Sequence, residues 1–177
     1  MSMQSMQTES KNRPSAPVTI KSIQDSVEVF SRTYDTGLLT PPGIDTSDAY
    51  TAGDAVGTQF QIHLPFTQGV LYSATYYDRD DEGTQMDLII SEFEWATKIA
   101  DDAAMSPVDV ELVKIIEVLE FASFEDFANG QISRLRNIGL AFNLDRHELW
   151  LQMETQSTPT IAAGSEPQVR LTFMGDA

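Results

Sequence analysis

Residues 138–144 read Ile-Gly-Leu-Ala-Phe-Asn-Leu, residues 149–153 read Leu-Trp-Leu-Gln-Met, and residues 169–173 read Val-Arg-Leu-Thr-Phe. In all three stretches every second residue is a large apolar one. Alternation with a period of two is typical of antiparallel strands that bury one face. The first two stretches are separated by only four residues, and the polar residues 145–147 among them suit a short turn. We therefore expect these two strands to form a hairpin.

The same alternation predicts the core of the protein. Side chains that face the core are expected at Leu140, Phe142, Leu151, Leu171 and Phe173. Farther toward the N-terminus, stretches rich in β-branched and aromatic residues predict more strands. These strands cover residues 27–32, 55–63, 69–77, 86–93 and 115–121.

One helix signal interrupts the strand pattern. Ser106 is a good N-cap and Pro107 suits the first helical position, and acidic residues follow at the positive end of the helix dipole. We expect this helix to end near Lys114. A long irregular stretch, which contains Pro41 and Pro42, precedes the second predicted strand. Long ordered loops tend to be functional or to cover another part of the protein.

Together these elements predict an all-β fold. We expect a two-sheet antiparallel β-sandwich, jelly-roll-like, with about eight strands and one short helix. Residues 21–177 are expected to form this single domain. Residues 1–20 are polar and show no periodicity, so we expect a flexible, extended N-terminal arm that becomes ordered only against a partner.

The composition argues against several classes of function. The chain of 177 residues has no cysteine, which removes disulfides, thiol nucleophiles and cysteine-bound zinc. The net charge is −16, the wrong sign for a protein that binds nucleic acid. No apolar run approaches the length of a membrane span, and the polar N-terminus lacks a secretory signal. We therefore expect neither nucleic acid nor membrane as a partner.

Motifs for catalysis or metal binding are weak. His63 and His147 lack the spacing of known metal motifs, and neither a Gly-x-Ser-x-Gly nor a phosphate-binding glycine loop with its lysine occurs. Residues 78–83 match the first half of a calcium-binding loop, but Ile89 stands where a glutamate is needed. An acidic hairpin tip is the better interpretation, and a looser ion site stays an alternative. We expect that the protein is not an enzyme and uses no cofactor or metal.

Four segments resemble virion proteins of tailed bacteriophages. Residues 49–57, Ala-Tyr-Thr-Ala-Gly-Asp-Ala-Val-Gly, are similar to the opening segment of small head-associated proteins, and residues 69–74 to their first core strand. Residues 99–106 are similar to an Ala-Asp-Asn-Ala midsection, with Asp102 in place of the usual asparagine, and residues 167–173 to the closing strand. The order of the segments, over about residues 45–174, carries the resemblance. It implies a jelly-roll-like virion protein, most plausibly a capsid cement or decoration subunit.

This resemblance also implies partners and a location. The partners would be the major capsid protein or other virion subunits, with further copies of the chain on the particle. The chain would lie in the virion, and in the host cytoplasm during assembly. Alternatives are a tail, neck or fibre-attachment protein, or a carbohydrate-binding β-sandwich adhesin, although two tryptophans are few for sugar platforms.

Candidate interface residues come from three regions of the sequence: the basic positions of the arm, the prolines of the long loop and three phenylalanines. They are Lys11, Arg13, Pro41, Pro42, Phe121, Phe124 and Phe127. The phenylalanines recur every three residues, which predicts an exposed stripe along one helical face. The alternative is that this stripe packs against the protein's own core.

Overall fold

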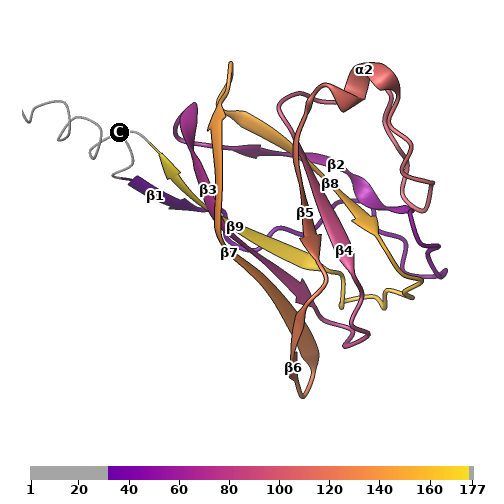
Figure 1. Cartoon of the computed structure of the whole chain (residues 1–177). Coiled ribbons are helices and arrows are strands. Elements are labelled where there is room, and N and C mark those ends of the chain that lie inside the picture. The colour runs from indigo at the N-terminus through magenta and orange to yellow at the C-terminus, as the bar shows by residue number, and fades with distance from the viewer. Residues whose placement is uncertain (1–31, 176–177) are drawn as a thin grey trace, which may run out of the picture.

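The computed structural model describes residues 32–175, which contain nine β-strands and one short helix joined by loops (Figure 1). The elements are β1 (Arg32–Asp35), β2 (Ala55–His63), β3 (Gln68–Asp78), β4 (Met86–Ser91), α2 (Asp109–Leu112), β5 (Ile115–Phe121), β6 (Phe124–Phe127), β7 (Gly130–Asn143), β8 (Glu148–Thr155) and β9 (Gln168–Gly175). The predicted arm, with Lys11 and Arg13, and most of the predicted strand 27–32 lie outside the described residues.

The strands form two antiparallel sheets that pack face to face. One sheet has the order β1-β9-β3-β7-β6 and the other the order β2-β8-β4-β5. Figure 1 shows the two layers, with α2 at one end of the sandwich. The expected all-β, two-sheet antiparallel sandwich is therefore confirmed.

The core lies between the sheets and follows the alternation of the sequence. Leu151, Leu171 and Phe173 are fully buried, and Phe142 is buried against Phe173 with an edge-to-face contact at 5.8 Å between ring centroids. Leu140 is only half-buried, contrary to expectation. The reason is its place at a sheet edge, because β6 pairs only with residues 130–133 and leaves the rest of β7 without a neighbour on that side.

The expected hairpin between residues 138–144 and 149–153 is wrong. β7 pairs with β3 and β6, whereas β8 pairs with β2 and β4 in the other sheet. The connection after β7 crosses from one sheet to the other beside the connection between β2 and β3. Two backbone hydrogen bonds join these crossings, from Leu144 N–H to the Thr67 carbonyl (2.8 Å) and from Leu64 N–H to the His147 carbonyl (2.9 Å). Alternation determines which face of a strand is buried, but it does not determine which strand lies beside it.

A β-bulge alters the faces of β3. The register with both neighbouring strands shifts between Leu71 and Ser73. Relative to β9, Tyr72 is an extra residue, whereas on the other side three residues of β7, 137–139, lie opposite it. Tyr72 is exposed. Leu71 and Ala74 consequently both reach the core, which strict alternation does not allow. The bulge therefore turns an aromatic side chain outward in the middle of the five-stranded sheet.

The helix is shorter than predicted. It begins after Val108, with no side-chain cap, so the expected N-cap at Ser106 is wrong. It ends at Leu112 because β5 starts at Ile115, which pairs with Ser91 of β4 and requires extended backbone. Within this single turn Glu111 is the buried residue, and the apolar side chains face outward.

Candidate functional site

Of the two prolines proposed as interface residues, one lies in the interior and one at the surface. Pro41 is buried and Pro42 is exposed. The Pro42 carbonyl accepts a hydrogen bond from Thr58 N–H at 2.8 Å, which fastens the long loop to β2. A side chain at Gly57, whose φ is +69°, would meet Pro41 at 2.7 Å, so this glycine allows the close approach. The pair serves to anchor the loop, and only Pro42 faces outward.

The phenylalanine stripe does not form a helix. Phe121 ends β5 and is fully buried, stacked on Tyr76 with 5.5 Å between ring centroids. Phe124, in β6, is half-buried and meets the same tyrosine edge-on at 6.1 Å. Only Phe127 is a surface residue, with 52% of it exposed at the end of β6. The alternative that the stripe packs on the protein's own core holds for Phe121 and, in part, for Phe124.

The acidic turn 78–83 holds neighbouring backbone in place. Asp78 accepts hydrogen bonds from the backbone N–H groups of Asp80 (3.2 Å) and Thr84 (3.1 Å). Asp80 and Glu82 accept hydrogen bonds from N–H groups of the loop between β8 and β9, at 2.7 and 3.3 Å. Within residues 32–175 no group of three or more His, Cys, Asp and Glu side chains is arranged to hold a metal ion.

Asp101 also has a structural role. Its carboxylate accepts hydrogen bonds from the Tyr50 hydroxyl (2.8 Å), from Asp45 N–H (2.7 Å) and from Gly57 N–H. Burial, and next the hydrogen bond to Asp101, raise the pKa of Tyr50 above its ordinary value. The carboxylate therefore joins the connection 92–114 to the long loop before β2 and to β2 itself. Its neighbour Asp102 takes a left-handed backbone conformation with φ of +57°.

The two histidines lie at neighbouring strand ends. His63 faces Glu148 in the β2–β8 pairing, and both histidines are exposed. The His147 ring lies 3.2 Å from the Leu64 carbonyl through Nδ1. Their expected position at the ends of strands on the surface is confirmed.

A second small core marks the most distinctive region of the sandwich, the connection 92–114 between β4 and β5. Trp95 and Ile99 of this connection are buried against Ala55 and Ile89, which lie on the outer face of the four-stranded sheet. The connection is therefore packed down on the sheet, and its far end presents α2.

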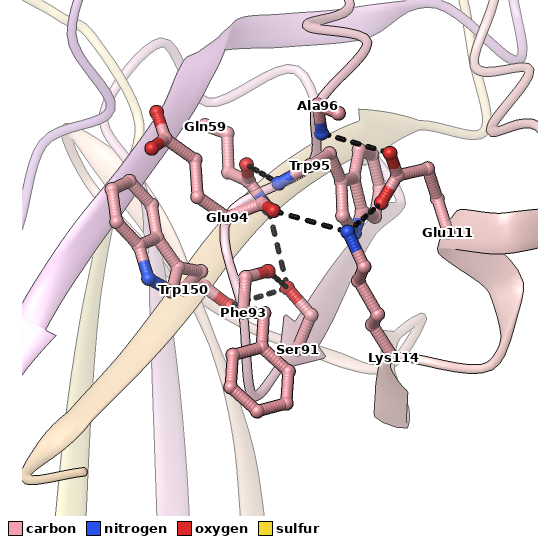
Figure 2. A network of polar contacts seen from close by, with 9 residues as sticks. All are labelled: Gln59, Ser91, Phe93, Glu94, Trp95, Ala96, Glu111, Lys114 and Trp150. Atoms are coloured by element: carbon pink, nitrogen blue, oxygen red, sulfur yellow. Dashed lines mark hydrogen bonds and ion pairs between the residues drawn. The ribbon is translucent and has the colours of Figure 1, made fainter.

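A network of polar contacts fixes the connection to the sheet (Figure 2). The side chain of Gln59 in β2 accepts a hydrogen bond from Trp95 N–H at 2.9 Å and donates one to the Ser91 hydroxyl at 3.2 Å. Ser91 in turn donates to the Phe93 carbonyl at 3.2 Å. Because an amide side chain both donates and accepts, one glutamine joins strand β2, strand β4 and the start of the connection.

Glu111 ties α2 to the other side of the same connection. Its fully buried carboxylate accepts a hydrogen bond from Ala96 N–H at 2.8 Å and forms an ion pair with Lys114 at 2.6 Å. Lys114 also donates to the Glu94 carbonyl at 3.3 Å. The hydrogen bond from Lys114, followed by the one from Ala96, lowers the pKa of the Glu111 carboxyl, so the buried group is held in its charged form.

Turning Glu111 inward leaves the apolar side chains of the segment outside. Val108, Val110, Leu112 and Val113 are 44%, 65%, 50% and 85% exposed. We call these four residues the 108–113 patch. Isolated surface apolar residues are ordinary, but four within six residues on a fixed turn form a candidate contact surface for another macromolecule.

The sequence pattern did not predict this patch. The pattern placed the acidic residues of this segment only at the positive end of the helix dipole, whereas Glu111 is the buried residue of the turn. The available signal was the run Val-Asp-Val-Glu-Leu-Val at 108–113, in which a single four-residue turn cannot bury all four apolar side chains.

Comparison with known proteins gives little. No family model matches this chain, and no curated protein matches it. A solved structure of TmCBM61 in complex with β-1,4-galactotriose is similar at 9% sequence identity, over 86% of this chain and 93% of that one, with a TM-score of 0.29. A likeness at this level supports no inference about ligand or function.

No helix among residues 32–175 has the length and apolar character needed to span a bilayer.

Proposed function

We propose that this chain is a non-enzymatic virion structural protein, a capsid cement or decoration subunit that binds and stabilises an assembled head. The observation that carries the proposal is the 108–113 patch, an apolar surface presented on a turn that buried contacts hold in place. The sequence resemblance to head-associated phage proteins supports the choice of partner.

The patch has the physical properties of a docking surface. Burying one valine or leucine side chain contributes about 1.5–3 kcal/mol, so four of them supply a useful share of a binding free energy. The ion pair of Glu111 with Lys114 already orders the turn before any contact forms. Preorganisation of this kind reduces the entropy cost of binding.

The charge of the chain fits attachment to a surface that already exists. At −16, copies repel one another in dilute solution, which disfavours free assembly into a shell. On a repeated lattice each copy contacts fixed subunits, and copies that share contacts gain avidity from individually weak interactions.

The backbone at Asp102 agrees with the resemblance. The related proteins are expected to carry asparagine at this position, and Asp102 adopts φ of +57°. Asparagine and aspartate are the non-glycine residues most enriched in this left-handed region. Either side chain therefore suits the same turn.

Binding of the purified chain to particles assembled without it tests the proposal. The unmodified chain should sediment with the particles at a fixed ratio to the shell subunit, whereas Val113→Asp should sediment at least about tenfold more weakly, because a charge then has to be buried. Leu38→Asp is the matched control, since Leu38 is also an exposed apolar residue, 57% accessible, and lies outside the patch. It should bind like the unmodified chain.

Other outcomes separate the alternatives. Equal binding of Val113→Asp and Leu38→Asp would remove the patch from the interface. A few copies confined to the portal end would favour a neck or tail protein over a cement subunit.

A carbohydrate-binding function is the second candidate, and one hollow favours it. Tyr77 and the exposed Phe127 line a cavity of about 300 Å³ between the end of β3 and the β6–β7 hairpin, together with Arg79, Asn129 and Gln131. Aromatic faces with adjacent amide groups suit a sugar ring. Glycan-array binding that Phe127→Ala abolishes would support this candidate, and an array without a signal would dismiss it.

A further inference from the structure

The two outer faces of the sandwich differ in their charged side chains, with arginines on one and unpaired carboxylates on the other. On the five-stranded sheet, Arg134 and Arg170 flank Thr75 from neighbouring strands, and Arg136 lies opposite Ser73. All three arginines are exposed, and residues adjacent to them in sequence, such as Leu135 and Leu171, pack into the core. They are three of the eight lysines and arginines among residues 32–175.

This arginine face has spare positive charge and apolar surface. Arg134 pairs with Glu125, and Arg170 pairs with Asp35 at 2.7 Å. Arg136 forms no ion pair within residues 32–175. The bulge residue Tyr72 is 44% exposed on the same sheet. Arginine and tyrosine are enriched at the centres of protein interfaces.

The outer face of the four-stranded sheet carries a row of carboxylates. Asp87 of β4 is registered against Glu154 of β8 on one side and Glu120 of β5 on the other. None of the three is in an ion pair with a cation of the described part of the chain. Burial, and next the charge of Glu120, raise the pKa of Asp87. No cation of residues 32–175 therefore offsets the repulsion among these three carboxylates by an ion pair.

We propose that the arginine face of one copy binds the carboxylate row of a second copy, with Arg136 directed toward Asp87 and Glu120. Each surface meets a different surface of its neighbour, so the contact is head-to-tail and leaves one free face at each end for another copy. Opposite charge sets the orientation, and the exposed aromatic residue supplies area. This contact is separate from the 108–113 patch, so copies held on a lattice can still touch one another.

Sedimentation equilibrium of the full chain tests the contact. We expect weak self-association at millimolar concentration, stronger at about 150 mM than at about 10 mM salt, because salt screens the long-range repulsion between the acidic bodies before it weakens local pairs. Arg136→Glu alone, and Glu120→Arg alone, should each weaken association about tenfold or more, since like charges then face each other.

The two single variants provide a sharp test when they are mixed. An equimolar mixture of Arg136→Glu with Glu120→Arg should associate again, and the double variant should associate with itself. Arg146→Glu and Asp48→Lys are matched controls for net charge, because both positions are exposed and outside the two faces. Neither control should weaken association, and Val113→Asp should leave it unchanged.

Three results would overturn the proposal: a chain that stays monomeric at every salt concentration, single reversals no worse than the controls, or a mixture that fails to regain association. Circular dichroism of each variant shows whether a loss comes from unfolding, and regained association in the mixture excludes that cause. If the unmodified chain self-associates as described but does not sediment with particles, the proposed function fails and this inference stands.

Discussion

The two outer faces of this sandwich differ in whether a segment of the chain covers them. Part of the four-stranded face is covered by the connection 92–114, with Trp95 buried in a second small core. No described segment forms such a core over the five-stranded face, which exposes Tyr72 and three arginines. The difference teaches that a sandwich can use its own chain to complete one sheet and leave the other available to a partner. The covering segment is also the one that presents the 108–113 patch.

The largest expected effect is on the stability of the covered face. Trp95→Ala should lower the free energy of unfolding by about 3–5 kcal/mol, because it empties the centre of the second core. Tyr72→Ala on the uncovered face should change it by about 0.5 kcal/mol or less. Urea unfolding measures both. Similar losses for the two variants would mean that the faces do not differ as described.

A smaller effect concerns the carboxylate row. Since the folded-state pKa of Asp87 is raised, its charged form opposes folding above that pKa, and the penalty disappears below the ordinary pKa of aspartate, about 4. Asp87→Asn should therefore raise the free energy of unfolding at pH 7 by at most about 1 kcal/mol, and the gain should vanish in acid. It should also keep the hydrogen bond from Gln156. A variant less stable than the parent at pH 7 would contradict this.

The uncovered face should show the opposite dependence on pH. The hydrogen bonds from Arg170 lower the pKa of Asp35, so this pair stabilises the fold above the ordinary aspartate pKa and loses its contribution as the pH falls through the lowered value. Arg170→Gln should lower the thermal midpoint only slightly at pH 7, because the pair is exposed to solvent. Thermal unfolding at pH 7 and pH 3 measures it. A cost that persists unchanged at pH 3 would assign the effect to packing.

Local patterns in the sequence predicted most of the strands. β2 and β5 have the predicted bounds, and the alternation in β8 and β9 placed the correct side chains in the core. These results depend only on side-chain periodicity, which each strand carries by itself. The pairing of β7 and β8 depends on which segments lie beside them, and two adjacent crossings between the sheets decided it. That information is not local to the residues 138–153.

The candidate site was harder to predict for the same reason. The spacing of the phenylalanines left open whether Phe121 lies at the surface or in the core, and the partner that buries it, Tyr76, lies 45 positions earlier in the chain. The sequence placed Glu111 only at the positive end of the helix dipole and did not predict its burial, whereas Ala96 and Lys114 surround its carboxylate. In both cases a distant or folded-back segment determined whether the side chain is inside. The 108–113 patch follows from the burial of Glu111 and was therefore missed with it.

The number of copies of this chain in purified particles tests the central claim most directly. Quantitative protein analysis of intact particles should find many copies in a fixed ratio to the shell subunit. Particles made without the chain should keep their shape and lose resistance to heat or osmotic shock. Absence of the chain from the particles, or undiminished resistance when it is missing, would contradict the account.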